Sequence, residues 1–354
     1  MNRIGALRLV VAGVLVVTAA ACETSDKPDD AAAAAQAYTR GEWATAAKLN
    51  LRAAEQGDAA AQHTLGVMYA YGRGVRYDPV EAMKWYRRAA DQGYAAAQYS
   101  LGLGYRDGEG VPPDIGEATT WLRKAAEQGH AVAQYTLGVM YAHGSAASKD
   151  DAEAMKWYRK SADNGHAAAQ YMVGMAYREG DVLPRDVAEA MKWFTRAAEQ
   201  GHPAAQYALG SGYRDGDGVP QNHALAMSWY REAAERDFTP AQYALGGGYA
   251  TGRGVPRDDG EAVRWYRKAA YRDYVPAQYS LAVMLANGRG VPADDVQAVS
   301  WYRMAAEQDY PPAQYGLGAM YAAGRGVPRD DARATTWYRK AAEQGYPTAR
   351  PSKE

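Results

Sequence analysis

The segment WYRKAAEQG, Trp337 to Gly345, combines residue types that can bind a ligand. A tryptophan beside arginine and lysine can hold a cation over its ring or stack against a base. Near-copies of this segment recur along the whole chain, so core packing is the alternative. Repetition favours packing, because a helical core needs every copy and a binding site seldom does. The charges of the segment then belong to a solvated face.

Adjacent carboxylates form a second candidate for chemistry, either acid–base catalysis or binding of a divalent ion. The pairs are Asp258/Asp259, Asp294/Asp295 and Asp330/Asp331. Each pair stands where a helix is predicted to begin, and an anion there is stabilised by unpaired N–H groups and the helix dipole. Helix capping is therefore the favoured interpretation.

Three histidines, His130, His166 and His202, are spaced so that they could form a row for a metal ion or a pH sensor. The equivalent position in other copies holds Tyr94, Phe238, Tyr274 and Tyr310. This equivalence favours a packing role for the histidines. We predict no catalytic residue, no metal ligand and no cofactor, because no nucleophile–base pair or phosphate-binding loop stands out.

Composition excludes some functions of this 354-residue chain. The formal net charge of −1 argues against a nucleic-acid binder, which needs a basic surface. The single cysteine, Cys22, excludes an intramolecular disulfide and a cysteine metal cluster.

The elements that must position these residues follow a strict period of 36 residues. Tryptophan occurs at 85, 121, 157, 193, 229, 265, 301 and 337, and glutamine and glycine keep the same interval. A period of this length indicates stacked supersecondary units.

Each unit is predicted to hold two helices, as the sixth unit illustrates. The first helix runs from about Pro240 to Thr251 and ends at Gly252, which suits a left-handed C-terminal stop. Asp258 then begins the second helix, and Glu261 completes a capping box. In the second helix Trp265 and its apolar neighbours recur at helical spacing on one face. Glycines inside the first helix, such as Gly246, imply that a neighbouring helix passes close to its backbone.

Taken together, the pattern AAAQ-LG-MY--G-GV--D--EAMKWYRKAAEQG resembles the Sel1-like repeat, a relative of the tetratricopeptide repeat. The resemblance implies an all-α fold, a right-handed superhelix or solenoid of 36-residue helix-turn-helix repeats, with the first helix of each pair towards the concave side. The predicted divisions are a lipoprotein signal peptide (1–21), a tether (22–30), an N-terminal capping helix pair (31–57), eight repeats (58–93, 94–129, 130–165, 166–201, 202–237, 238–273, 274–309 and 310–345) and a tail (346–354).

Positions that vary between repeats are the candidates for partner binding. They lie at the end of the first helix, where the middle repeats become charged and the later repeats keep an arginine row at Arg253, Arg289 and Arg325. The predicted partner-binding residues are Tyr71, Arg106, Asp107, His143, Arg178, Glu179, Arg214 and Asp215. A graded charged surface can orient a protein or peptide partner, and drift on a solvated face is the alternative.

The N-terminus is predicted to be a targeting segment. Arg3 and Arg8 precede the apolar run Leu9–Val17, and the small residues that follow lead directly to Cys22. This arrangement resembles a bacterial lipobox, which implies lipidation of Cys22; an ordinary signal peptide is the alternative. Glu23 after the cysteine suggests, by analogy, the outer membrane with the protein facing the periplasm.

The predicted function is a non-enzymatic, lipid-anchored scaffold or adaptor for protein–protein interactions in envelope assembly or signalling. The predicted partners are a protein or peptide and, through the lipid, the membrane. The alternative is a β-lactamase-like or cell-wall-active enzyme, since cysteine-rich members of the family have been described in that way. Those members have a disulfide in each repeat, and this chain has one cysteine in total.

Overall fold

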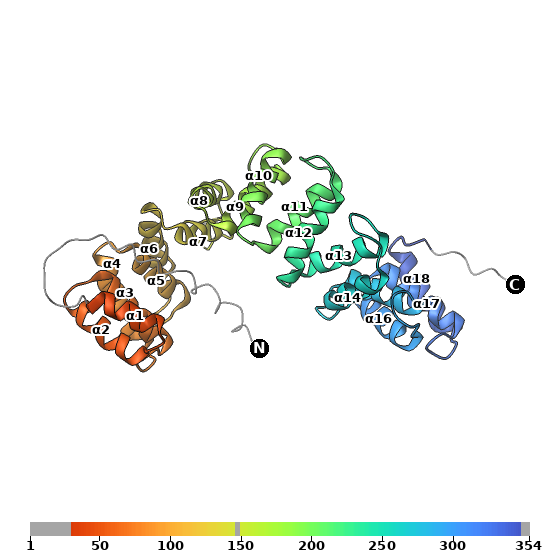
Figure 1. Cartoon of the computed structure of the whole chain (residues 1–354), viewed down its shortest axis with the longest axis horizontal. Helices are drawn as coiled ribbons and strands as arrows, with labels where there is room; N and C mark the ends of the chain where they lie inside the picture. Colours follow the sequence, from red (N-terminus) through yellow and green to blue (C-terminus); the bar gives the residue numbers. More distant parts are fainter. Residues whose placement is uncertain (1–29, 146–148, 348–354) are drawn as a thin grey trace. The chain divides into compact units, whose positions relative to one another are not determined.

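The structure, a computed structural model, describes residues 30–145 and 149–347. Within these ranges it contains 18 α-helices and no strand (Figure 1). They are α1 (Asp30–Thr39), α2 (Trp43–Glu55), α3 (Ala59–Tyr71), α4 (Pro79–Asp91), α5 (Ala95–Asp107), α6 (Ile115–Glu127), α7 (Ala131–Ala142), α8 (Asp151–Asp163), α9 (Ala167–Glu179), α10 (Val187–Glu199), α11 (Pro203–Asp215), α12 (His223–Glu235), α13 (Thr239–Thr251), α14 (Asp259–Ala270), α15 (Val275–Ala286), α16 (Asp295–Glu307), α17 (Pro311–Ala323) and α18 (Asp331–Glu343). The predicted all-α fold of paired helices repeating every 36 residues is confirmed. None of the helices in the described ranges is both long and apolar enough to cross a membrane.

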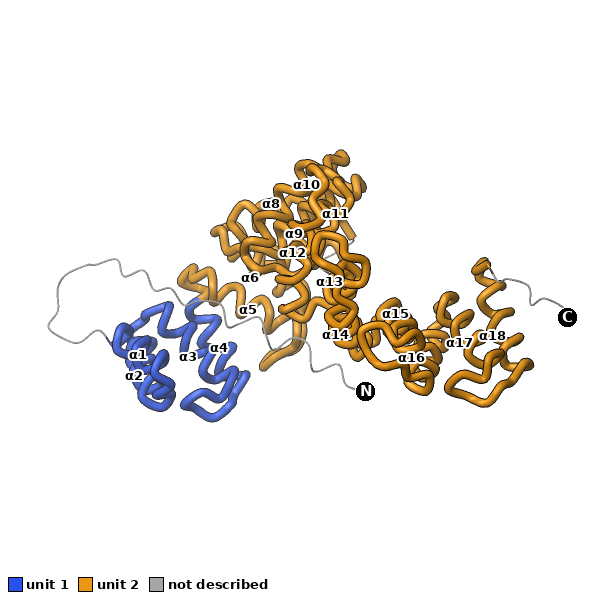
Figure 2. Tube along the Cα trace, turned by 45° about the vertical axis from the view of Figure 1, so that its right-hand side comes forward, with its two compact units in different colours: residues 1–89 blue, residues 90–354 orange. Residues whose placement is uncertain are grey.

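The chain divides into two compact units, residues 1–89 and residues 90–354, with the boundary inside α4 (Figure 2). In the described part of the first unit, α2 packs against both α1 and α3. Its core combines small alanines with a few large side chains, among them Leu65, Met68 and Trp85. The small alanines let the helices approach closely.

In the second unit each helix from α6 to α17 packs against the helix before it and the helix after it. The core is a continuous series of alanines and leucines with the large side chains of Trp193, Phe194 and Tyr230 fully buried among them. Because contacts run between neighbours in the sequence, every repeat builds its part of the core from the same few residue types.

The predicted starts and stops of the helices are confirmed in the sixth repeat. Helix α13 begins at Thr239, one residue before the expected Pro240, and Gly252 ends it with a φ of 73°. Asp258 accepts a hydrogen bond from the backbone N–H of Glu261 at 2.9 Å and caps α14. The same cap is formed in every repeat, including those with Asn222 and Asp330, where leucine or arginine replaces the glutamate three residues later.

The expected capping box forms only one of its two hydrogen bonds. The side chain of Glu261 does not accept from the N–H of Asp258, because that N–H donates to the carbonyl of Tyr249 at 3.0 Å. The carboxylate of Glu261 instead accepts from Nε1 of Trp265 at 3.1 Å. The backbone of the preceding helix thus satisfies the amide that a local motif would otherwise have satisfied.

The close approach predicted from the helix glycines is also observed. A Cβ added to Gly246 would lie 2.7 Å from Cδ1 of Tyr266 on α14. In the seventh repeat the glycine is replaced by Ala282, and the ring of Tyr302 adopts a different tilt. Its interplanar angle to the tyrosine of the preceding helix is 55°, whereas the equivalent ring pairs of the four repeats before it have 37–42°.

Candidate functional site

The tryptophan segment makes most of its cation–π contacts within its own helix. Nζ of Lys268 lies 4.2 Å from the centroid of the Trp265 ring, and Lys340 lies 4.6 Å from that of Trp337. Trp193 is also contacted from the preceding repeat, by Arg159 at 4.7 Å. Trp265 is buried. The cation of the segment therefore covers a packed ring from outside, which supports packing.

The charged candidates at the ends of the first helices form pairs with their sequence neighbours. Nε of Arg106 donates to Oδ1 of Asp107 at 2.7 Å, and its Nη2 donates to Oδ2 at 2.8 Å. Arg214 binds Asp215 in the same bidentate way, at 2.8 and 2.7 Å. Each pair therefore adds an exposed dipole to the surface and no net charge.

The ion pairs also shift protonation equilibria. The hydrogen bond from Arg214 lowers the pKa of Asp215, and the reciprocal bond raises the pKa of Arg214. The hydrogen bond to Asp107 likewise raises the pKa of Arg106. Arg106, Arg214 and Asp215 therefore stay ionised near neutral pH and do not supply a proton donor or acceptor for catalysis.

The remaining candidates differ from this pattern. Arg178 and Glu179 approach only to 3.7 Å. His143 follows the last residue of α7, and its Nδ1 lies 2.9 Å from the carbonyl oxygen of Val139. Tyr71, in the first unit, is 51% exposed, with the guanidinium of Arg73 5.5 Å from its ring centroid. These residues occupy equivalent or adjacent positions of their repeats and show no shared catalytic geometry.

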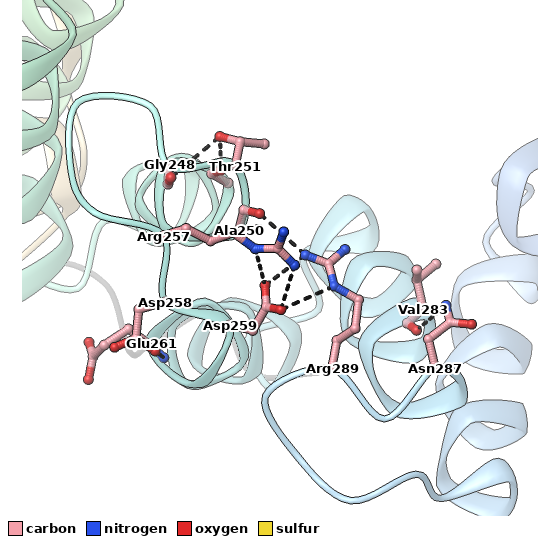
Figure 3. Close-up of polar contacts among 11 residues, drawn as sticks. Gly248, Ala250, Thr251, Arg257, Asp258, Asp259, Glu261, Val283, Asn287 and Arg289 are labelled. Carbon is pink, nitrogen blue, oxygen red and sulfur yellow. Dashed lines mark hydrogen bonds and ion pairs between the residues drawn. The ribbon is translucent and has the colours of Figure 1, made fainter.

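Two of the three arginines in the row of the later repeats, Arg289 and Arg325, do not form the free surface that the sequence suggested, whereas Arg253 is exposed. Arg289 binds Asp259 of the preceding repeat at 2.7 Å, and Asp259 also accepts from Arg257 at 2.8 Å (Figure 3). Arg325 binds Asp295 of its preceding repeat at 2.6 Å. These arginines hold neighbouring repeats together. The second aspartates of the first two pairs, Asp259 and Asp295, were expected to support a helix cap and are the acceptors of this bridge. Asp331 of the third pair accepts from Arg329 of its own repeat.

For Arg73, Arg289 and Arg325, the residue 30 positions earlier in the sequence is a contact partner of the guanidinium. Asp259 and Asp295 stand 30 residues before Arg289 and Arg325. Trp43 has that place relative to Arg73, whose guanidinium lies 5.4 Å from its ring centroid. The two guanidinium groups around Asp259, Arg257 first and then Arg289, lower its pKa to about 2. An Asp259 ionised so strongly is an ion-pair partner and not a general base.

The three histidines cap helices. Nδ1 of His130 accepts from the N–H of Ala133 at 3.1 Å, and His166 and His202 cap α9 and α11 in the same way. Each ring also packs on a tyrosine of the preceding repeat, at 5.0 Å between the ring centroids of His130 and Tyr99. Burial lowers the pKa of all three histidines. Packing is therefore one part of their role, and capping, which the sequence did not suggest, is the other.

A buried hydrogen-bonded glutamine in each repeat was noted in the sequence only as a marker of the period. Nε2 of Gln134 donates to the carbonyl of Ala126 at 2.8 Å, and its Oε1 accepts at 2.9 Å from Asn164, just after the second helix of the same repeat. Gln128 bridges to Gln98 in the same way, at 2.7 Å. Glutamine or asparagine at the end of the second helix, within AAEQG, was the signal that could have revealed this bridge.

The described residues form no cluster of side chains that is suited to a metal ion. Between residues 30 and 347, leaving aside 146–148, no three histidine, cysteine, aspartate or glutamate side chains gather in a way that could hold a metal ion. Cys22, the predicted lipidation site, lies outside the described residues. What the arrangement does offer is a series of repeats with charged pairs on the helix ends.

Comparison with known proteins identifies the repeat. A family model described as the Sel1 repeat matches eight segments: 59–94, 95–130, 131–166, 167–202, 203–238, 239–274, 275–310 and 311–346. No protein with a curated description matches the chain.

Two solved structures are similar over most of the chain. A protective antigen, c5321, present in uropathogenic Escherichia coli strains and described as having an SLR fold, is 39% identical with a TM-score of 0.79. That match covers 84% of this chain and 64% of the antigen, so this chain spans less than two thirds of its length. A Sel1 repeat protein from Oxalobacter formigenes is 36% identical with a TM-score of 0.64, covering 68% of this chain and 99% of the other.

Proposed function

Because the chain belongs to the Sel1 repeat family, we propose that it is a non-enzymatic scaffold that binds a protein or peptide partner in the cell envelope. The observation that carries this proposal is that repeating and varying positions have different roles within each repeat. The residues that repeat are used for packing, capping and bridging. Most of the residues that vary remain on the surface, where a partner can contact them.

The proposed contact surface in the second unit consists of the helix-end residues Arg106, Asp107, His143, Arg178, Glu179, Arg214 and Asp215. Tyr71 is the equivalent candidate in the first unit. The bidentate pairs favour a partner that is itself polar, since a guanidinium in such a pair keeps donors free and its carboxylate keeps acceptors free. Such contacts supply orientation and specificity more than affinity.

The proposed location is the outer membrane, facing the periplasm, with a lipid on Cys22. The basic start, the apolar run Leu9–Val17 and the small residues before the cysteine support this proposal.

The contact surface is tested by photo-crosslinking in the native envelope. Replacing Asp107, Glu179 and Asp215 together with alanine should reduce crosslinking to the partner while leaving helicity unchanged. The matched control replaces Asp163, Glu199 and Glu235, acids of the same charge at the ends of second helices. Equal crosslinking by both triple variants would exclude the helix-end surface.

The lipid anchor has its own test. Cys22→Ser should abolish palmitate labelling and release the protein from the membrane fraction. Unchanged fractionation would exclude the anchor while leaving the scaffold proposal in place.

An enzyme remains the alternative function, and turnover by the purified chain from residue 23 onwards would support it. We expect no hydrolysis of nitrocefin or of peptidoglycan fragments. Saturable turnover, removed by a single substitution that preserves helicity, would overturn the scaffold proposal.

A further inference from the structure

The exposed face of the second helix differs between the sixth repeat and every other repeat. At the last exposed position of the second helix, seven repeats have an acid: Asp91, Glu127, Asp163, Glu199, Glu235, Glu307 and Glu343. The sixth repeat has Tyr271 there, and its side chain is 72% exposed. An aromatic ring in place of a carboxylate removes a charge and adds an apolar surface.

A hollow lies beside this tyrosine. It measures about 360 Å³, and its apolar lining comes from Gly260 and Val263 on α14, from Tyr271 directly after that helix and from Val291 in the turn of the next repeat. Gly260 opens it, because the same position holds valine or alanine in all repeats but the second. The second repeat, with Gly116, has the equivalent hollow, lined by Thr119, Thr120, Arg123, Lys124 and Glu127. Of these two hollows, the one in the sixth repeat has the more apolar lining.

Positive charge surrounds this apolar hollow. Arg264, Arg267 and Lys268 line it, and the sole carboxylate on this face of α14, Glu261, is bound to Arg264 at 3.0 Å. The guanidinium of Arg267 has no ion-pair partner among the described residues. With three cations and one anion, the face has an excess of two positive charges at neutral pH.

Further apolar side chains continue the surface onto α16. The ring of Tyr271 packs edge-on against Trp301, with 5.3 Å between centroids. Val296 is 64% exposed and Met304 48% exposed, and they lie two turns apart on the same side of the helix. Met304 replaces a charged residue that every other repeat has at this position.

We propose that this surface, the α14 hollow, binds an acidic peptide segment of a partner protein that inserts one apolar side chain between Tyr271 and Val263. The cations are complementary to the acidic residues of the peptide, and an aromatic or branched side chain fits the hollow. The α14 hollow is independent of the helix-end surface proposed above, because it lies on the other helix of the repeat.

A peptide is favoured over an anionic membrane by the small extent of the positive surface. On α12 the equivalent of Lys268 is Glu232, and on α16 it is the uncharged Met304. A membrane would be attracted by cations spread over several neighbouring repeats, whereas α12 and α16, the second helices of the repeats before and after α14, lack this excess.

The test uses a fluorescein-labelled, capped peptide rich in glutamate with one central phenylalanine, and measures its fluorescence anisotropy with the full chain. We expect saturable binding that weakens with salt. The same peptide with central alanine, and a lysine-rich peptide with central phenylalanine, should bind at least about fivefold more weakly.

Three variants locate the binding. Gly260→Val fills the hollow, and a Cβ there meets nothing closer than the 3.3 Å to Oδ1 of its own capping residue, Asp258. Tyr271→Glu restores the acid of the other repeats, and Arg267→Glu reverses a charge. Each should weaken binding by about fivefold or more. Gly116→Val, the matched change in the second repeat, should leave it unchanged.

Four results would overturn the proposal. They are the absence of saturable binding up to about 1 mM peptide, equal binding of the phenylalanine and alanine peptides, an equal loss in Gly260→Val and Gly116→Val, or binding to anionic phospholipid vesicles without binding to the peptide. Circular dichroism of each variant separates these results from a loss of folding.

Discussion

Gly316→Ala examines the packing argument where one tyrosine ring contacts two repeats. Other repeats have a side chain at this position, for example Ala244 and Met172, so a methyl group is compatible with the helix itself. In the eighth repeat a Cβ on Gly316 would lie 2.6 Å from Cε1 of Tyr302. Carbon atoms prefer about 3.5–4.0 Å, so the ring would have to move by about 1 Å. It cannot return to the place that equivalent rings occupy, because the methyl group of Ala282 fills it.

The expected magnitude follows from two opposing terms. Overpacking costs about 1–3 kcal/mol, and replacing a helical glycine with alanine gains about 1 kcal/mol. Gly316→Ala should therefore change stability by about zero to 2 kcal/mol in the destabilising direction. In an Ala282→Gly background the ring regains its usual place, and the same change should stabilise by about 1 kcal/mol. The coupling between the two substitutions should thus be about 1–3 kcal/mol.

The assay is hydrogen exchange of the α15–α18 amides in the full chain, because a series of repeats need not unfold in one step. Gly247→Ala is the control, since its Cβ would meet only the Tyr266 hydroxyl, at an ordinary 3.7 Å. That variant should slow exchange in α13. If Gly316→Ala had the same effect in the wild-type chain and in the Ala282→Gly background, within about 0.5 kcal/mol, the steric reasoning would be refuted.

Three further predictions concern the polar contacts. Arg236→Gln should raise the free energy of unfolding by about 1 kcal/mol, because a glutamine at this position can donate to the buried Oε1 of Gln206, which has no hydrogen-bond partner in the structure. An unchanged urea midpoint would contradict this prediction. Asp259→Asn should lower the urea midpoint at neutral pH. The difference from wild type should shrink as the pH falls from about 4 towards 2, because the folded pKa of Asp259 is lowered to about 2 and the bridge is lost only as this carboxylate becomes protonated. A pH-independent difference would exclude the bridge. Burial lowers the pKa of the three capping histidines below their ordinary value, so the unfolded chain binds more protons than the folded chain. The melting temperature should therefore fall as the pH drops below about 6.5. Replacing all three histidines with tyrosine should reduce this pH dependence, and a pH dependence of the same size would show that other groups cause it.

The sequence by itself determined the repeat, its helices and their ends. The caps at Asp258 and its equivalents and the stop at Gly252 depend on atoms a few residues apart, so local spacing was enough to predict them. The close approach at Gly246 also followed, because a glycine that recurs inside a helix needs a packing reason.

Only the tertiary structure decided which partner each polar side chain chose. Glu261 could return to the cap or bind Trp265, and Arg289 could face solvent or reach Asp259 in the preceding repeat. His130 could pack, bind a ligand or cap a helix, and it both packs and caps. The apolar hollow at Gly260 likewise depends on Val291, contributed by the next repeat. Each of these outcomes depends on how closely neighbouring helices pack, a distance fixed by many side chains together and by no single motif.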